Sequence, residues 1–101
     1  MSDKWKARQE LCKVYKMYDK KAHSVLYSRS YNAIEYNQLQ DIKYAITYML
    51  CEYFDFNYEF YYDYFPYSYK WNIAYDYVKY HNRCKEAYKQ FVKEKNLVEM
   101  C

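Results

Sequence analysis

The chain contains no glycine and a single proline, Pro66, in 101 residues. Glycine adopts positive φ without steric cost, and tight hairpin turns and phosphate-binding loops depend on that freedom. Collagen-like repeats need glycine because no side chain fits at the triple-helix axis. The composition therefore excludes those structures. The length suits one domain, because domains of about 100–150 residues are the commonest. We expect residues 1–101 to form a single helical domain.

Aromatic side chains supply apolar area that aliphatic residues do not. Leu, Ile, Val and Phe together number 19, close to the level of disordered chains, but the net charge is only +3. The chain also holds 18 Tyr, 5 Phe and 2 Trp. Each aromatic ring buries roughly 150–250 Å² when it packs, so we expect a folded domain with a tyrosine-rich core.

Hydrophobic periodicity predicts a first helix over residues 3–28 and a second that begins at Asn32. Glu35 stands three residues after Asn32, which completes a pair resembling a capping box. The first apolar stripe consists of Leu11, Tyr15, Tyr18, Ala22 and Val25. The second consists of Ile34, Leu39, Ile42, Ile46, Met49, Leu50 and Tyr53.

A third helix is expected from about residue 68 to residue 95. Apolar residues alternate from Tyr67 to Tyr77 as they would in a strand, but this pattern stops there. A polar stripe at helical spacing continues for about six turns and favours a helix. Asn96 then suits the left-handed position that closes a helix when no glycine is present.

Three amphipathic helices with short connections predict an all-α fold, an antiparallel three-helix bundle with an aromatic-rich connector around 54–66. That connector also alternates with a period of two, from Phe54 to Tyr64, as a strand does. A lone strand needs a partner. The alternative is therefore an α+β domain whose aromatic strand pairs across a homodimer.

Charge is distributed unevenly along the chain. Residues 1–29 carry eight Lys and Arg against three acids, whereas residues 45–69 carry four acids and no Lys or Arg. Residues 53–69 hold eleven aromatics in seventeen positions, more than one connector can bury. An exposed patch of tyrosines beside carboxylates is typical of protein recognition. The predicted partner-binding residues are Glu52, Asp55, Glu59, Asp63, Tyr58, Tyr61, Tyr62 and Tyr64.

The basic first helix suggests an alternative role in nucleic-acid binding. Its lysines could hold phosphates while neighbouring aromatic rings stack on bases. The residues expected to do so are Lys13, Lys16, Lys20 and Lys21. The overall pI of 8.5 is modest for such a domain, and a solvated helix face explains the same lysines.

Neither a metal centre nor an enzyme is expected. His81 and Cys84 stand three apart, close enough to share a metal, but the other histidine and cysteines fall elsewhere along the helices. A nucleophilic set made from Cys84, His81 and Glu86 would lie on one helix and would not converge on one reacting atom. We therefore predict no catalytic residues, no metal and no cofactor.

The first residues lack the apolar core and cleavage site typical of a signal peptide, and no run of 18 apolar residues is present. The separations of the four cysteines fit no zinc-knuckle or twin-Cys pattern, and we expect these cysteines to be reduced. We expect a soluble cytoplasmic protein, in the host cytoplasm if viral. Small size and abundant tyrosine resemble phage and viral accessory proteins. The leading hypothesis is a non-enzymatic inhibitor that binds a larger basic protein, such as a host nuclease or another nucleic-acid-binding protein. A structural subunit of a larger assembly is a third alternative.

Overall fold

The computed structural model describes residues 3–54, 73 and 75–97, and throughout this part the regular structure is α-helical. The helices are α1 (Asp3–Leu26), α2 (Ala33–Tyr53) and α4 (His81–Glu94). Residues 75–79 form a further helical turn before α4. The predicted all-α class is thereby confirmed. Apart from Phe54, the 54–66 connector and the alternative strand lie outside the described residues.

The start of α2 is the one that the sequence predicts. The side chain of Asn32 accepts hydrogen bonds from the backbone amides of Ile34 and Glu35, at 3.0 and 3.1 Å. These amides belong to the first turn, where no helical carbonyl is available to them. Asn32 has an extended backbone, with φ −120° and ψ 110°, as an N-cap residue requires.

The end of α4 is closed by Asn96, which has a φ of 53°. The amide of Leu97 donates to the carbonyl of Val92 at 2.9 Å, and the amide of Asn96 donates to that of Lys93 at 3.2 Å. This pair of bonds is the Schellman motif, which normally places glycine at the left-handed position. Asparagine tolerates that conformation, so a chain without glycine can still end a helix sharply.

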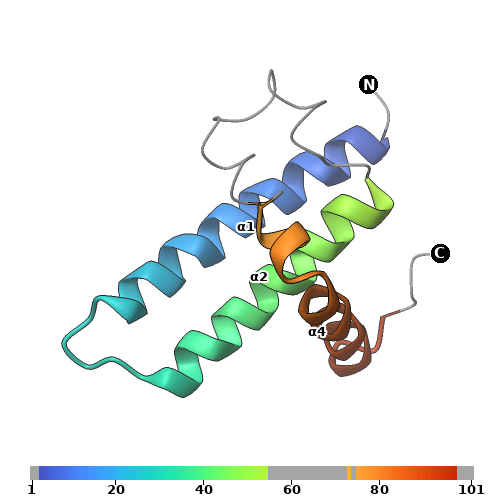
Figure 1. The fold of residues 1–101 in the computed structure, drawn as a ribbon. Coiled ribbons are helices and arrows are strands. Elements are labelled where there is room, and N and C mark those ends of the chain that lie inside the picture. Colours follow the sequence, from blue (N-terminus) through green and yellow to red (C-terminus); the bar gives the residue numbers. More distant parts are fainter. Residues whose placement is uncertain (1–2, 55–72, 74, 98–101) are drawn as a thin grey trace.

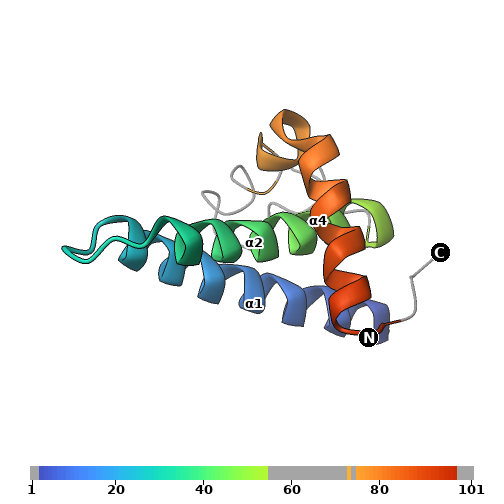
Figure 2. The ribbon, with the colours of Figure 1, turned by 90° about the horizontal axis from the view of Figure 1, so that it is seen from below.

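Helices α1 and α2 run antiparallel and are joined by the short segment 27–32 (Figure 1). Helix α4 packs on α2 and crosses the pair instead of lying alongside it (Figure 2). The sequence predicted one continuous third helix in antiparallel alignment. In the described part the chain instead turns at Tyr80, whose φ of −120° and ψ of 31° are not helical. Its ring packs against Tyr44 of α2, with centroids 5.4 Å apart, and this long-range contact accompanies the bend.

The core lies between α2 and its two neighbours. Its buried residues are Cys12, Tyr15, Ala45, Ile46, Met49, Leu50, Ile73, Tyr88 and Val92. Tyrosine rings join α2 to α4: the centroids of Tyr48 and Tyr88 lie 5.0 Å apart, and those of Tyr53 and Tyr88 lie 5.6 Å apart. Such ring contacts add to the free energy gained from area burial alone.

Candidate functional site: a polar cavity and two charged surfaces

Of the predicted acidic and aromatic binding residues, the structure describes Glu52. It is exposed near the end of α2 and accepts a hydrogen bond from the hydroxyl of Tyr77. Tyr53 is half-buried and Phe54 is buried. The carbonyl of Phe54 accepts a hydrogen bond from Arg8 Nη1 at 3.1 Å. The start of the acidic segment is therefore fixed to the helical core. The other predicted binding residues, Asp55, Tyr58, Glu59, Tyr61, Tyr62, Asp63 and Tyr64, lie outside the described residues.

The lysines of the alternative hypothesis lie along α1, where Lys13, Lys20 and Lys21 are exposed and Lys16 is half-buried. Lys13 Nζ lies 3.3 Å from Glu10 Oε1, and Lys21 Nζ lies 5.2 Å from the ring centroid of Tyr18. The first contact neutralises part of the basic face. The structure thus places these residues on the surface of one helix, together with an acidic neighbour.

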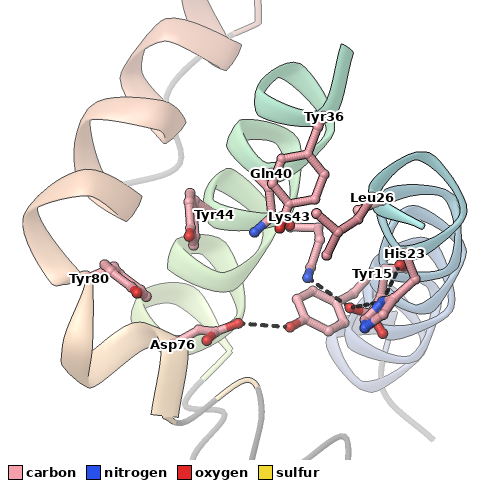
Figure 3. A pocket seen from close by; sticks show the side chains of 11 residues that line it. Tyr15, His23, Leu26, Tyr36, Gln40, Lys43, Tyr44, Asp76 and Tyr80 are labelled. Carbon is pink, nitrogen blue, oxygen red and sulfur yellow. Dashed lines mark hydrogen bonds and ion pairs between the residues drawn. The ribbon is translucent and has the colours of Figure 1, made fainter. Parts of the chain in front are cut away.

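The structure also shows a site that the sequence reasoning did not identify, a polar cavity of about 290 Å³. It lies between α1, α2 and the turn before α4, and its lining is mostly polar (Figure 3). Its central side chain is Lys43, which is only 7 % exposed although lysine is rarely buried without a partner. The partner is Asp19 of α1, whose Oδ1 lies 2.7 Å from Lys43 Nζ.

A second interaction lies beside this ion pair, since Lys43 Nζ is 5.4 Å from the ring centroid of Tyr15. The hydroxyl of Tyr15, a residue that is 1 % exposed, donates to Asp76 Oδ2 at 3.2 Å. Figure 3 shows the two side chains pointing toward each other from α1 and from the turn before α4. This hydrogen bond joins residues 61 positions apart. It connects α1 to the segment before α4 across the cavity.

Burial governs the titration of these groups. It raises the pKa of the Asp76 carboxyl, and this effect outweighs the nearby Lys43 ammonium and the Tyr15 hydrogen bond, both of which lower that pKa. Burial also raises the pKa of Tyr15, with a further contribution from the Asp76 and Asp19 carboxylates. Tyr15 is therefore a neutral hydrogen-bond donor at physiological pH.

Aromatic rings line one side of the cavity. Tyr44 and Tyr80 face it from α2 and from the bend before α4, and Tyr36 stands at another edge (Figure 3). Both Tyr44 and Tyr80 already contact cations that do not line the cavity. Arg83 Cζ lies 4.9 Å from the ring centroid of Tyr44, and Lys79 Nζ lies 5.1 Å from that of Tyr80. Each ring therefore already makes a cation–π contact with a side chain of this protein.

The sequence contains a signal for this site in the apolar stripes themselves. Asp19 falls four residues after Tyr15 and three before Ala22, so it occupies a core-facing position of α1. Lys43 likewise stands between Leu39 and Ile46 at spacings of four and three. Opposite charges at core-facing positions of neighbouring helices indicate a buried ion pair.

The cysteines of the described part are free thiols: Cys12 and Cys84 are buried, and Cys51 is half-buried. Burial raises the pKa of each to about 12, which makes the reactive thiolate scarce at neutral pH. His81 is exposed and its ring lies 5.0 Å from that of Tyr77. Among the described residues, no three His, Cys, Asp or Glu side chains gather as a metal site would require.

No protein-family model matches the chain, and none of the curated proteins or solved structures compared with it does so either. Within the described ranges, no helix is both long and apolar enough to cross a membrane.

Proposed function

We propose that the protein is a small non-enzymatic binding protein that docks on a basic surface of a larger protein. The docking surface is the acidic and aromatic segment from Glu52 to Tyr64. The observation that carries this proposal is charge segregation: residues 45–69 hold four carboxylates and no Lys or Arg, in a chain whose net charge is +3. Carboxylates steer encounter with a basic partner, and buried tyrosines supply most of the affinity.

The described geometry supports this proposal at the start of the segment. Glu52 is exposed, while Phe54 is 5 % exposed and its carbonyl accepts from Arg8. A segment anchored in this way loses less conformational entropy on binding than a free chain would. The partner class is a nuclease or another nucleic-acid-binding protein, because carboxylates can occupy positions where such a protein normally holds phosphates. Binding there would inhibit the partner by occlusion, as expected of a viral accessory protein.

Charge reversal tests the proposal. The protein is used to capture partners from a lysate of its native host, with and without nuclease treatment. The triple variant Asp55→Lys, Glu59→Lys, Asp63→Lys should lose the captured protein. Tyr61→Ala or Tyr62→Ala should speed dissociation of the captured protein, with a loss of about 2 kcal/mol of binding free energy if the tyrosine is a hot spot. A matched triple variant of the first helix, Lys13→Glu, Lys16→Glu, Lys20→Glu, should retain it. Each variant must first melt like the parent.

The second candidate function is nucleic-acid binding by α1, which the exposed Lys13, Lys20 and Lys21 favour. It predicts the reverse ranking of the two triple variants. It also predicts that affinity falls linearly with salt on a logarithmic plot and that nuclease removes the captured material. If only the lysine variant abolishes binding, the acidic docking surface is wrong.

We further propose that residues 1–101 fold as one three-helix domain in which segment 54–66 connects α2 to the last helix. One cooperative unfolding transition, shared by circular dichroism and tyrosine fluorescence, would support this. The exposed aromatic surface that the sequence predicts within 53–69 also favours a homodimer, which sedimentation at several salt concentrations would reveal. Three free thiols support a reducing compartment such as the cytoplasm.

A further inference from the structure

The polar cavity is lined by groups that also connect the helices. Its volume of about 290 Å³ is near the lower end of the range for small-molecule sites, about 300–1,000 Å³. Its polar groups are held in place from three segments, by the Asp19–Lys43 ion pair and the Tyr15–Asp76 hydrogen bond. A site of this kind is organised before any ligand arrives, which lowers the entropic cost of binding.

The charges around the cavity do not cancel. Within the lining, Asp19 and Asp76 contribute two carboxylates against the single ammonium of Lys43, which lies 2.7 Å from Asp19. Lys43 and, from outside the lining, Lys79 also act electrostatically on Asp76. Asp76 Oδ2 accepts from Tyr15, whereas Oδ1 has no hydrogen-bond or ion-pair partner among residues 3–54, 73 and 75–97. The raised pKa of Asp76 agrees with a half-buried carboxylate whose charge is incompletely compensated. Among the groups that line the cavity, carboxylates therefore outnumber ammonium groups, which favours a cationic ligand over an anionic one.

The aromatic side of the cavity favours an organic cation over a metal ion. Metal ions such as Mg²⁺ and Ca²⁺ prefer several oxygen ligands, and a wall of tyrosine rings offers few. Ring faces instead attract organic cations, whose methylene groups also gain from apolar contact. Tyr44 and Tyr80 provide such rings beside Asp76 (Figure 3). Arg83 and Lys79 already contact these rings from outside the cavity lining, so a ligand would share the rings with them.

We propose that this cavity binds a linear alkylammonium group, with the ammonium at Asp76 Oδ1 and the methylene chain against Tyr44 and Tyr80. This chemistry occurs in free polyamines and in the lysine side chain of a protein partner. The described residues of the docking surface, from Glu52 to Phe54, do not line this cavity.

Calorimetric titration of the parent protein tests the proposal with defined probes. The probe for the polyamine source is 1,5-diaminopentane. The probe for the side-chain source is Nα-acetyl-lysine amide, whose side-chain ammonium is free, and 1-pentanol is the uncharged control. Binding of either amine, with no binding of pentanol, is the expected result. The tighter of the two amines identifies the source. Failure of both amines to bind at millimolar concentration, or equal binding of pentanol, would overturn the proposal.

Variants separate binding at this site from adventitious charge pairing. Asp76→Asn keeps an oxygen that accepts from Tyr15, so it should fold, and it should weaken amine binding about tenfold or more. Asp41→Asn removes an exposed carboxylate that pairs with Arg83 outside the cavity, and it should bind amines as the parent does. Equal weakening by both variants would contradict the site.

A second pair of variants tests the aromatic wall. Tyr80→Phe retains the ring face and should retain binding, whereas Tyr80→Leu should weaken it about threefold. The triple variant Asp55→Lys, Glu59→Lys, Asp63→Lys should bind amines normally. Its behaviour distinguishes a failure of the cavity from a failure of the proposed docking function.

Discussion

Replacing Lys43 by methionine should expose the energetic role of the buried ion pair. Methionine has a similar length and no charge, so packing changes little. The side chains of Lys43 and Asp19 are only 8 % and 14 % exposed, and their charged atoms lie 2.7 Å apart. With an effective dielectric constant of about 20, the Coulomb attraction at this distance is about 6 kcal/mol. Desolvation of both groups cancels much of that gain.

The expected loss for Lys43→Met is about 3 kcal/mol in the free energy of unfolding, because Asp19 would remain buried without its cation. His23 Nδ1 lies 3.6 Å from Asp19 Oδ1 but is mostly exposed, so it compensates only weakly and only when protonated. The double variant Asp19→Leu, Lys43→Met should recover most of the loss, because neither member of the ion pair then remains buried without its partner. Urea denaturation at pH 7, monitored by circular dichroism, measures the free energy of unfolding of the parent and of each variant.

Lys20→Met is the matched control, since Lys20 is an exposed lysine of α1. Its free energy of unfolding should stay within about 0.5 kcal/mol of the parent value. The reasoning is refuted if Lys43→Met costs no more than this control. The single variant Asp19→Leu completes the cycle. The reasoning is also refuted if the double variant loses as much stability as Lys43→Met and Asp19→Leu lose together, because the two charges would then act independently.

Three further predictions concern a cap, the thiols and a carboxyl group. Asn32→Ala should lower the free energy of unfolding by about 1 kcal/mol, since two amides of α2 lose their acceptor; urea denaturation measures this. In a Cys101→Ser background, the three described thiols should react with a disulfide reagent only as the protein opens, because burial raises their pKa to about 12. Asp76→Asn should raise the Tm at pH 7, because burial raises the pKa of Asp76 and its ionisation therefore lowers stability as pH rises through that pKa.

Each of these predictions has an opposing outcome. An Asn32→Ala variant as stable as the parent would show that the cap bonds contribute nothing net. Rapid labelling of the thiols in the native protein would show that they are accessible. A lower Tm for Asp76→Asn at pH 7 would mean that the charged carboxylate stabilises the fold. A carboxyl group whose pKa is raised by folding should instead destabilise the fold when it ionises.

The local features of the helices were predictable from the sequence. The first helix was expected over residues 3–28 and ends at Leu26, and the second begins after its Asn32 cap. Asn96 closes the last helix in the expected left-handed conformation. These features depend on neighbours within about five residues, through side-chain caps and apolar spacing, so sequence patterns record them directly.

The course of the third helix was not predictable in the same way. A polar stripe continues through Tyr80, yet the backbone bends at that residue and its ring packs on Tyr44. Asp76, Lys79 and Arg83 belong to this polar stripe, which predicts that all three lie on one solvent-exposed helix face. Asp76 instead accepts a hydrogen bond from Tyr15 inside the protein. Helical periodicity describes one helix and contains no information on where its neighbours cross it.

The sequence by itself determined that the chain forms amphipathic helices, where two of them begin or end, and that opposite charges interrupt the apolar stripes at Asp19 and Lys43. Only the tertiary structure decided that these two side chains meet and that Tyr15 and Asp76, 61 residues apart, enclose a polar cavity with them. The physical reason is that caps and spacing act within one helix. Contacts between helices depend instead on crossing angle and rotation, which the packing of the whole core sets.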